Sequence, residues 1–158
     1  MENTKQQYIE EKGNCAKALF LEGYNCAQSV AMAFAKELNL PPKSVAGAVS
    51  AFGGGLGRMR EVCGAVSGMA FVIGSLKGYE DPRDNEEKSA LYALIQTIAA
   101  EFRQNNGSII CRELLSGKIE KVSDTPEPAE RTPAYYKKRP CAELVECAAR
   151  LTAKYLRE

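Results

Sequence analysis

The spacing of apolar residues limits most strongly what this chain can fold into. Apolar side chains return every three or four positions over long stretches, which is typical of helices that bury one face. The clearest case is the stretch from Glu86 to Gln104, whose apolar stripe includes Leu91, Leu94 and Ile98. No stretch alternates apolar and polar residues as a half-buried strand would. The sequence therefore predicts an all-α protein.

Start and stop signals divide the chain into about six helices, which we expect to form one compact domain over residues 1–158. An N-terminal helix is expected within residues 1–22, ending before Gly23. Asn25 followed by Gln28 has the pattern of a capping box, and Pro41-Pro42 begins another helix. Later helices are expected at Glu61–Leu76, Glu86–Gln104, from Ser108 to Leu115, and Pro140–Leu156. Residues 118–138 are predicted to be a proline-containing loop.

A glycine-rich segment precedes the helix that we expect at the centre of the bundle. Four of the five residues from Gly53 to Gly57 are glycine, a density that disfavours helix. The helix that follows, Glu61–Leu76, is rich in small residues, which let neighbouring backbones approach closely. Such a helix suits the seam of a homodimer as well as a tight monomer core.

The same segment is a candidate binding loop through Gly54, Gly55, Gly57 and Arg58, because a glycine-rich turn before a helix can cradle a phosphate or another anion. It lacks the Lys-Ser/Thr pair of a P-loop, and no strand precedes it. A tight turn between helices is the simpler interpretation and the one we favour. In a third interpretation, the loop backbone donates hydrogen bonds to the sulfur of Cys63.

Composition excludes several classes of function. The chain has six cysteines, no histidine and no tryptophan. Without histidine there is no Ser-His-Asp or Cys-His catalysis, no mixed Cys/His zinc site and no C-x-x-C-H haem attachment. With 21 basic and 20 acidic residues, the net charge of +1 favours neither nucleic acid nor an anionic membrane as a partner.

The expected compartment shapes how the cysteines are interpreted. The polar N-terminus resembles no signal peptide, and the longest apolar stretch, Val62 to Leu76, is too short to span a bilayer. We therefore expect a cytoplasmic protein, in which thiols are kept reduced. Six cysteines in such a chain indicate metal binding, catalysis or redox cycling rather than structural disulfides.

Four of the cysteines fall within the first turn of a predicted helix. These are Cys26, Cys63, Cys111 and Cys141. Unpaired amides and the helix dipole stabilise a thiolate at that position, which makes it nucleophilic or metal-binding. The alternative is that these cysteines are buried small apolar residues, the role that we assign to Cys15 and Cys147 inside their helices.

The order of these motifs resembles the C-GCAxxG-C-C family, small bacterial and archaeal proteins named for an expected redox activity. The resemblance rests on Asn25-Cys26-Ala27-Gln28, on Cys63-Gly64-Ala65-Val66-Ser67-Gly68 after the glycine run, on Cys111 and on Arg139-Pro140-Cys141. It implies a helical domain related to part of the split-Soret cytochromes, with the same four cysteines as the family's own. Arg60 and Glu61 stand where a glycine is expected.

Three functions stay open at this point. In the first, two cysteines cycle between dithiol and disulfide with an unidentified redox partner; Cys63 attacks, and Cys26 or Cys141 resolves. In the second, Cys26, Cys63, Cys111 and Cys141 hold an iron–sulfur cluster or zinc, for electron transfer or redox sensing. In the third, a helical interaction domain contains inert cysteines. Which cofactor is bound, if any, the sequence leaves unknown.

Overall fold

The computed structural model describes residues 2–158, and this part of the chain is all helical. It contains nine α-helices, where the sequence predicted about six, and one short 3₁₀ helix at Ser50–Phe52. The only β pairing among these residues is an isolated antiparallel bridge between Val62 and Ile110. The helices are α1 (Glu2–Leu21), α2 (Cys26–Met32), α3 (Ala35–Leu38), α4 (Pro42–Val49), α5 (Gly64–Lys77), α6 (Asn85–Asn106), α7 (Cys111–Leu115), α8 (Pro133–Lys138) and α9 (Cys141–Leu156).

One of the additional helices lies inside the segment that was predicted to be a loop. Residues 133–138 form α8 because Thr132 caps it, accepting a hydrogen bond from the Tyr135 amide at 3.1 Å, while Pro133 occupies the first helical position. The loop therefore ends at Thr132. We call residues 116–132 the proline strap.

Helix α5 begins three residues later than expected, at Gly64 rather than Glu61. The intervening residues are extended because they pair with the start of α7. The Cys63 amide donates to the Ile109 carbonyl at 2.7 Å, and the Cys111 amide donates to the Glu61 carbonyl at 2.7 Å. This short pairing fixes the starts of α5 and α7 side by side.

Two helices share the centre of the bundle. Helix α5 packs against α2, α3, α6 and α9, and α9 packs against α1, α2, α5 and α6. The core between them is built from fully buried apolar side chains, including Phe20, Phe34, Ile73, Ile98, Phe102 and Val145. No helix of the described residues is both long and apolar enough to cross a membrane.

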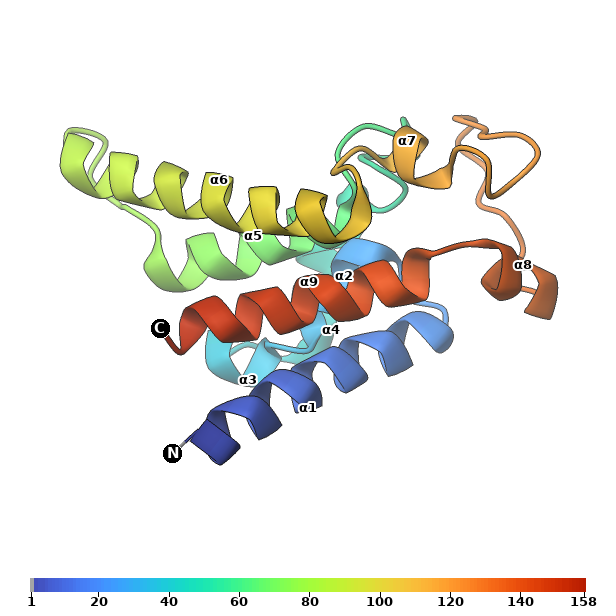
Figure 1. Cartoon of the computed structure of the whole chain (residues 1–158). Coiled ribbons are helices and arrows are strands. Elements are labelled where there is room, and N and C mark those ends of the chain that lie inside the picture. The colour runs from blue at the N-terminus through green and yellow to red at the C-terminus, as the bar shows by residue number, and fades with distance from the viewer. Residues whose placement is uncertain (1) are drawn as a thin grey trace.

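The loops gather at one end of the bundle. In Figure 1 the glycine segment, α7, the proline strap and α8 lie at the end opposite the two termini. Helices α2, α5, α7 and α9 all begin at this end of the bundle. Four helix starts, the glycine segment and the proline strap therefore meet at one end of the bundle.

Candidate functional site

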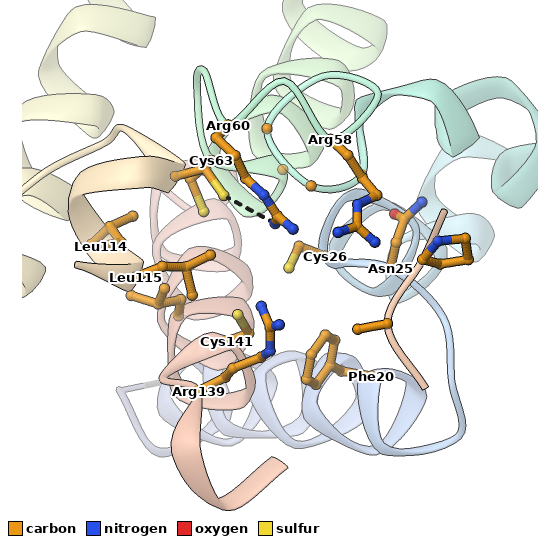
Figure 2. Close-up of a pocket in the computed structure, with 18 of the residues that line it drawn as sticks. Phe20, Asn25, Cys26, Arg58, Arg60, Cys63, Leu114, Leu115, Arg139 and Cys141 are labelled. Atoms are coloured by element: carbon orange, nitrogen blue, oxygen red, sulfur yellow. Dashed lines mark hydrogen bonds between the residues drawn. The ribbon is translucent and has the colours of Figure 1, made fainter. Parts of the chain in front are cut away.

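The four cysteines at helix starts border one cavity of about 460 Å³. Cys26, Cys111 and Cys141 are the first residues of α2, α7 and α9, and Cys63 is the residue that caps α5. All four therefore stand at helix starts, although Cys63 precedes the first turn of α5 instead of lying within it as predicted. Figure 2 shows Cys26, Cys63 and Cys141 around the cavity, with arginine side chains reaching in from its walls.

Two glycines of α5 bring Cys63 close to Cys26. A Cβ on Gly64 would lie 3.1 Å from the Cys26 Cβ and 3.0 Å from the Phe52 carbonyl oxygen. A Cβ on Gly68, one turn later, would lie 2.8 Å from the Ala27 carbonyl oxygen. Only glycine permits this approach, so the Cys63-Gly64-Ala65-x-x-Gly68 segment packs directly onto the first turn of α2.

The segment from Gly53 to Arg60 folds into a compact loop with an unusual backbone. Three of its residues that are not glycine have left-handed conformations: Leu56, Arg58 and Arg60, with φ of 69°, 64° and 62°. Such conformations are costly for residues with a Cβ, and they persist where the surrounding structure holds them. Gly55 (φ 71°) has a further reason to be glycine, because a Cβ there would lie 2.7 Å from the Cys111 Cβ.

The loop borders the cavity with both glycines and arginine side chains. Gly54, Gly55, Gly57 and Arg58, the predicted binding residues, all line the cavity. The Gly57 amide, however, donates to the Ala51 carbonyl at 2.8 Å, and the Arg58 amide donates to Gly53 at 3.2 Å. These two amides are therefore occupied within the loop, while the side chains of Arg58 and Arg60 extend into the cavity (Figure 2).

Four arginines and no carboxylate line the cavity. They are Arg58, Arg60, Arg131 and Arg139. None of them forms an ion pair within residues 2–158. Burial and the positive charges of Arg60 and Arg139 lower the pKa of Arg58. The cavity is therefore a concentrated and uncompensated positive site.

Aromatic rings hold two of these arginines. The Arg131 guanidinium carbon lies 4.5 Å from the centre of the Phe20 ring, and its nitrogens donate to the carbonyls of Phe20 and Tyr24, each at 3.1 Å. The Arg139 guanidinium lies 4.3 Å from the centre of the Tyr135 ring. Stacked guanidinium groups are fixed in orientation and keep their charge.

The proline strap closes the cavity by bonding to the loop arginines. Arg60 Nε donates to the Ser123 carbonyl at 2.8 Å, and Arg58 Nη1 donates to the Glu127 carbonyl. Pro126 and Pro128 of the strap line the cavity directly. The buried Nε of Arg58 has no hydrogen-bond partner among the described residues.

Cys141 and Cys26 interact across the cavity wall. The neighbouring Cys26 thiol and the positive charges of Arg139, Arg131 and Arg60 lower the pKa of Cys141, against the opposing effect of burial. The neighbouring Cys141 thiol and burial raise the pKa of Cys26 well above its usual range. Of the two sulfurs, Cys141 is therefore the one that favours the thiolate.

The low pKa expected for Cys63 is wrong. Its side chain is 4% exposed, and burial raises its pKa to about 12, although the amides of Ala65 and Val66 oppose that rise. Burial also raises the pKa of Cys111, in spite of Arg60 Nη1, which lies 3.7 Å from the Cys111 sulfur. A helix start alone does not stabilise a thiolate when the sulfur is removed from water.

Sequence reasoning missed Arg131, Phe20 and the proline strap as parts of the site. Arg131 lies in a polar stretch with no motif around it, more than a hundred residues from Phe20. No local pattern predicts such a contact. Two cavity arginines did give a local signal: Arg58 was predicted as a binding residue, and Arg139 directly precedes the helix-opening Pro140-Cys141 pair.

The other two cysteines lie elsewhere. Cys15 is on the exposed side of α1, and Cys147 lies inside α9 beside a second cavity of about 390 Å³ between α1, α6 and α9. The side-chain amide of Asn106 donates to the Cys147 sulfur at 3.4 Å. Neither cysteine belongs to the cavity formed by the helix starts.

Nowhere in residues 2–158 are three or more cysteine, aspartate or glutamate side chains placed so that they could hold one metal ion. In this arrangement the four thiols border the cavity without meeting at a common point. All six cysteines are free thiols.

Comparison with known proteins gives one match. The model of a family described as "Putative redox-active protein (C_GCAxxG_C_C)" matches residues 24–155, from just before Cys26 to the end of α9. No curated protein and no solved structure matches the chain.

Proposed function

The chain belongs to the C_GCAxxG_C_C family, and on that basis we propose that it is a thiol redox protein in which Cys141 and Cys26 cycle between dithiol and disulfide. Family membership supports redox activity in general. The choice of this pair rests on geometry: both thiols stand at helix starts on the wall of one cavity, beside Arg139. Their interaction agrees with this choice, because it lowers the pKa of Cys141 and raises that of Cys26. That is the arrangement of a nucleophile and its resolving partner.

The reaction follows from the different protonation of the two sulfurs. The Cys141 thiolate attacks one sulfur of a disulfide RSSR, forming a Cys141–S–S–R bond and releasing RS⁻. Cys26 loses its proton and attacks the Cys141 sulfur, forming the Cys26–Cys141 disulfide and releasing a second RS⁻. Two electrons pass from the protein to RSSR; one leaving thiolate takes up the proton of Cys26, and the other is protonated by solvent. An external dithiol then reduces the protein disulfide and restores the starting state.

This proposal moves the attacking role from Cys63 to Cys141. Cys63 meets the positional criterion that the sequence offered, but its burial keeps it protonated at neutral pH. Cys141 is partly exposed to the cavity and has three arginines to stabilise its charge. Thiol exchange requires both thiolate character and access, and of the four cavity cysteines Cys141 satisfies both best.

Peptide mapping after oxidation tests the proposal. The reduced protein is treated with one equivalent of hydroxyethyl disulfide, quenched with acid and digested. We expect a Cys26–Cys141 disulfide that dithiothreitol reverses, and in Cys26→Ser a mixed disulfide trapped on Cys141. Cys147→Ser, altered in the same helix but outside the cavity, should react like the unaltered protein. Oxidation that spares Cys141 would overturn the assignment.

A metal centre on the same four thiols is the second candidate, favoured by their shared cavity. Four thiolates form the ligand set of zinc or of an iron–sulfur cluster, and binding would draw the sulfurs together. Metal analysis and a visible spectrum of protein purified without oxygen separate the two functions. Stoichiometric metal that is lost in Cys63→Ser as well as in Cys141→Ser would favour this candidate, because the dithiol cycle does not require Cys63.

A further inference from the structure

Besides the thiol pair, the otherwise largely apolar wall of the cavity carries several positive charges. Guanidinium groups of Arg58, Arg60 and Arg139 project into the space from the glycine loop and from the residues before α9 (Figure 2). A volume of about 460 Å³ lies within the usual range for small-molecule sites. The arginines extend the positive surface well beyond what stabilising one thiolate would require.

This charge is not neutralised by the protein itself. Among residues 2–158, no aspartate or glutamate lines the cavity, and the loop arginines bond only to neutral carbonyls of the strap and to the Cys111 sulfur. Burial, together with repulsion from Arg60 and Arg139, lowers the pKa of Arg58. A group of like charges held together in this way is relieved by binding an anion.

Arg58 is the residue best placed to bind a ligand. Its Nε is buried and has no partner, although its Nη1 donates to the Glu127 carbonyl. An unsatisfied buried N–H costs free energy that a hydrogen-bond acceptor would recover. The left-handed backbone at Arg58 is a further cost that the loop tolerates in order to aim this side chain inward.

We propose that the arginine-lined part of this cavity recognises negatively charged groups on a small disulfide, so that anionic disulfides are the substrate class of the thiol pair. This inference rests on the proposed function for the disulfide chemistry, whereas the anion recognition rests on the arginines alone. Arg58 and Arg139 hold the anionic ends, and the sulfur–sulfur bond lies against Cys141. The exchange steps and their electron balance are those given above, with an external dithiol as the final reductant.

Three small disulfides that differ mainly in charge test the selectivity. These are dithiodipropionate, hydroxyethyl disulfide and cystamine, which are anionic, neutral and cationic at neutral pH. We expect oxidation of the protein to be fastest with dithiodipropionate and slowest with cystamine, by about tenfold at each step, even though anions repel a thiolate in free solution. Added salt should reduce the differences in oxidation rate among the three disulfides. The inference would be overturned by equal rates, or by rates that are slowest with dithiodipropionate because the anion repels the thiolate.

The matched variants are Arg58→Gln and Arg83→Gln, each of which removes one positive charge. Arg83 is exposed in the turn before α6 and pairs only with Asp81, so its loss should leave the charge preference intact. Arg58→Gln should reduce the rate with dithiodipropionate by about tenfold more than the rate with hydroxyethyl disulfide. A uniform loss with all three disulfides would mean that Arg58 only supports the loop, and would contradict its role in recognition.

A ligand without sulfur separates this inference from the proposed function. Octanedioate has the length and charge of dithiodipropionate but cannot exchange with a thiol, and its binding to Cys141→Ser can be measured by calorimetry. We expect binding that Arg58→Gln weakens and Arg83→Gln does not. If octanedioate binds while no disulfide oxidises the protein, anion recognition stands and the thiol cycle fails. If the thiol cycle proceeds without octanedioate binding or charge preference, this inference fails alone.

Discussion

The two cavities of this protein have similar sizes and both contain a cysteine of α9, yet they differ in charge. Around Cys141, four arginines face no carboxylate. Around Cys147, Arg150 pairs with Glu146 at 2.8 Å and Lys154 pairs with Glu101 at 2.9 Å. Two cysteines six residues apart on one helix therefore lie in a positive and in a neutralised environment. The difference indicates that the balance of charges around a thiol, rather than the helix that carries it, favours its ionisation.

Thiol reactivity should separate the two cavities most strongly. With iodoacetamide, a neutral reagent, we expect Cys141 to be alkylated about tenfold or more faster than Cys147 at neutral pH, because a lowered pKa raises its thiolate fraction. The rates follow from mass spectrometry of quenched digests. The fast phase of alkylation should be absent from Cys141→Ser and present in Cys147→Ser. Faster labelling of Cys147 would reverse the comparison.

Close backbone packing beneath the thiol cavity should contribute more to the free energy of unfolding than packing farther along α5. Gly68→Ala forces a Cβ to within 2.8 Å of the Ala27 carbonyl, and should lower the free energy of unfolding by about 1–3 kcal/mol. Gly74→Ala in the same helix meets nothing within 4 Å and should raise it by about 0.5–1 kcal/mol. Urea unfolding followed by circular dichroism measures both. Equal effects would show that α5 does not depend on close contact with α2.

The pH dependence of alkylation measures how much of the lowered pKa of Cys141 is due to arginine. Because the pKa of Cys141 is lowered, its thiolate is present at pH values where an ordinary thiol is still protonated, and its reactivity is lost only on further acidification. Arg139→Gln should move the midpoint of the pH–rate profile upward and slow the reaction severalfold at neutral pH. Arg150→Gln, in the second cavity, is the control. A midpoint that does not move would show that Arg139 does not contribute to the shift.

The smallest expected effect concerns the backbone that presents Arg60. Arg60→Gly and Arg60→Ala both remove the guanidinium, but only glycine fits φ 62° without strain. We expect Arg60→Gly to be the more stable variant by about 1 kcal/mol in urea unfolding. In both variants the proline strap loses its bond at Ser123 and should become more sensitive to limited proteolysis. Equal stabilities would indicate that the loop relaxes and that its left-handed backbone stores no strain.

Much of the fold was predictable because its signals are local. The apolar stripe of α6, the Asn25–Gln28 capping box and the prolines that begin helices act over only a few residues. The extra helices were missed because they are short: α3 has four residues and α8 six, too few for periodicity to show. The start of α5 was misplaced because the extended residues before it pair with a segment nearly fifty positions away. The single-domain organisation stays a prediction.

The sequence by itself determined which cysteines stand at helix starts, because caps, prolines and glycines fix helix ends through nearby atoms. Only the tertiary structure decided which of those thiols has a lowered pKa. That outcome depends on burial, on the Cys26–Cys141 contact and on Arg131, which is brought from a distant loop onto Phe20. Electrostatic energies depend on distance and on access to water, and both are set by the packing of segments far apart in the chain.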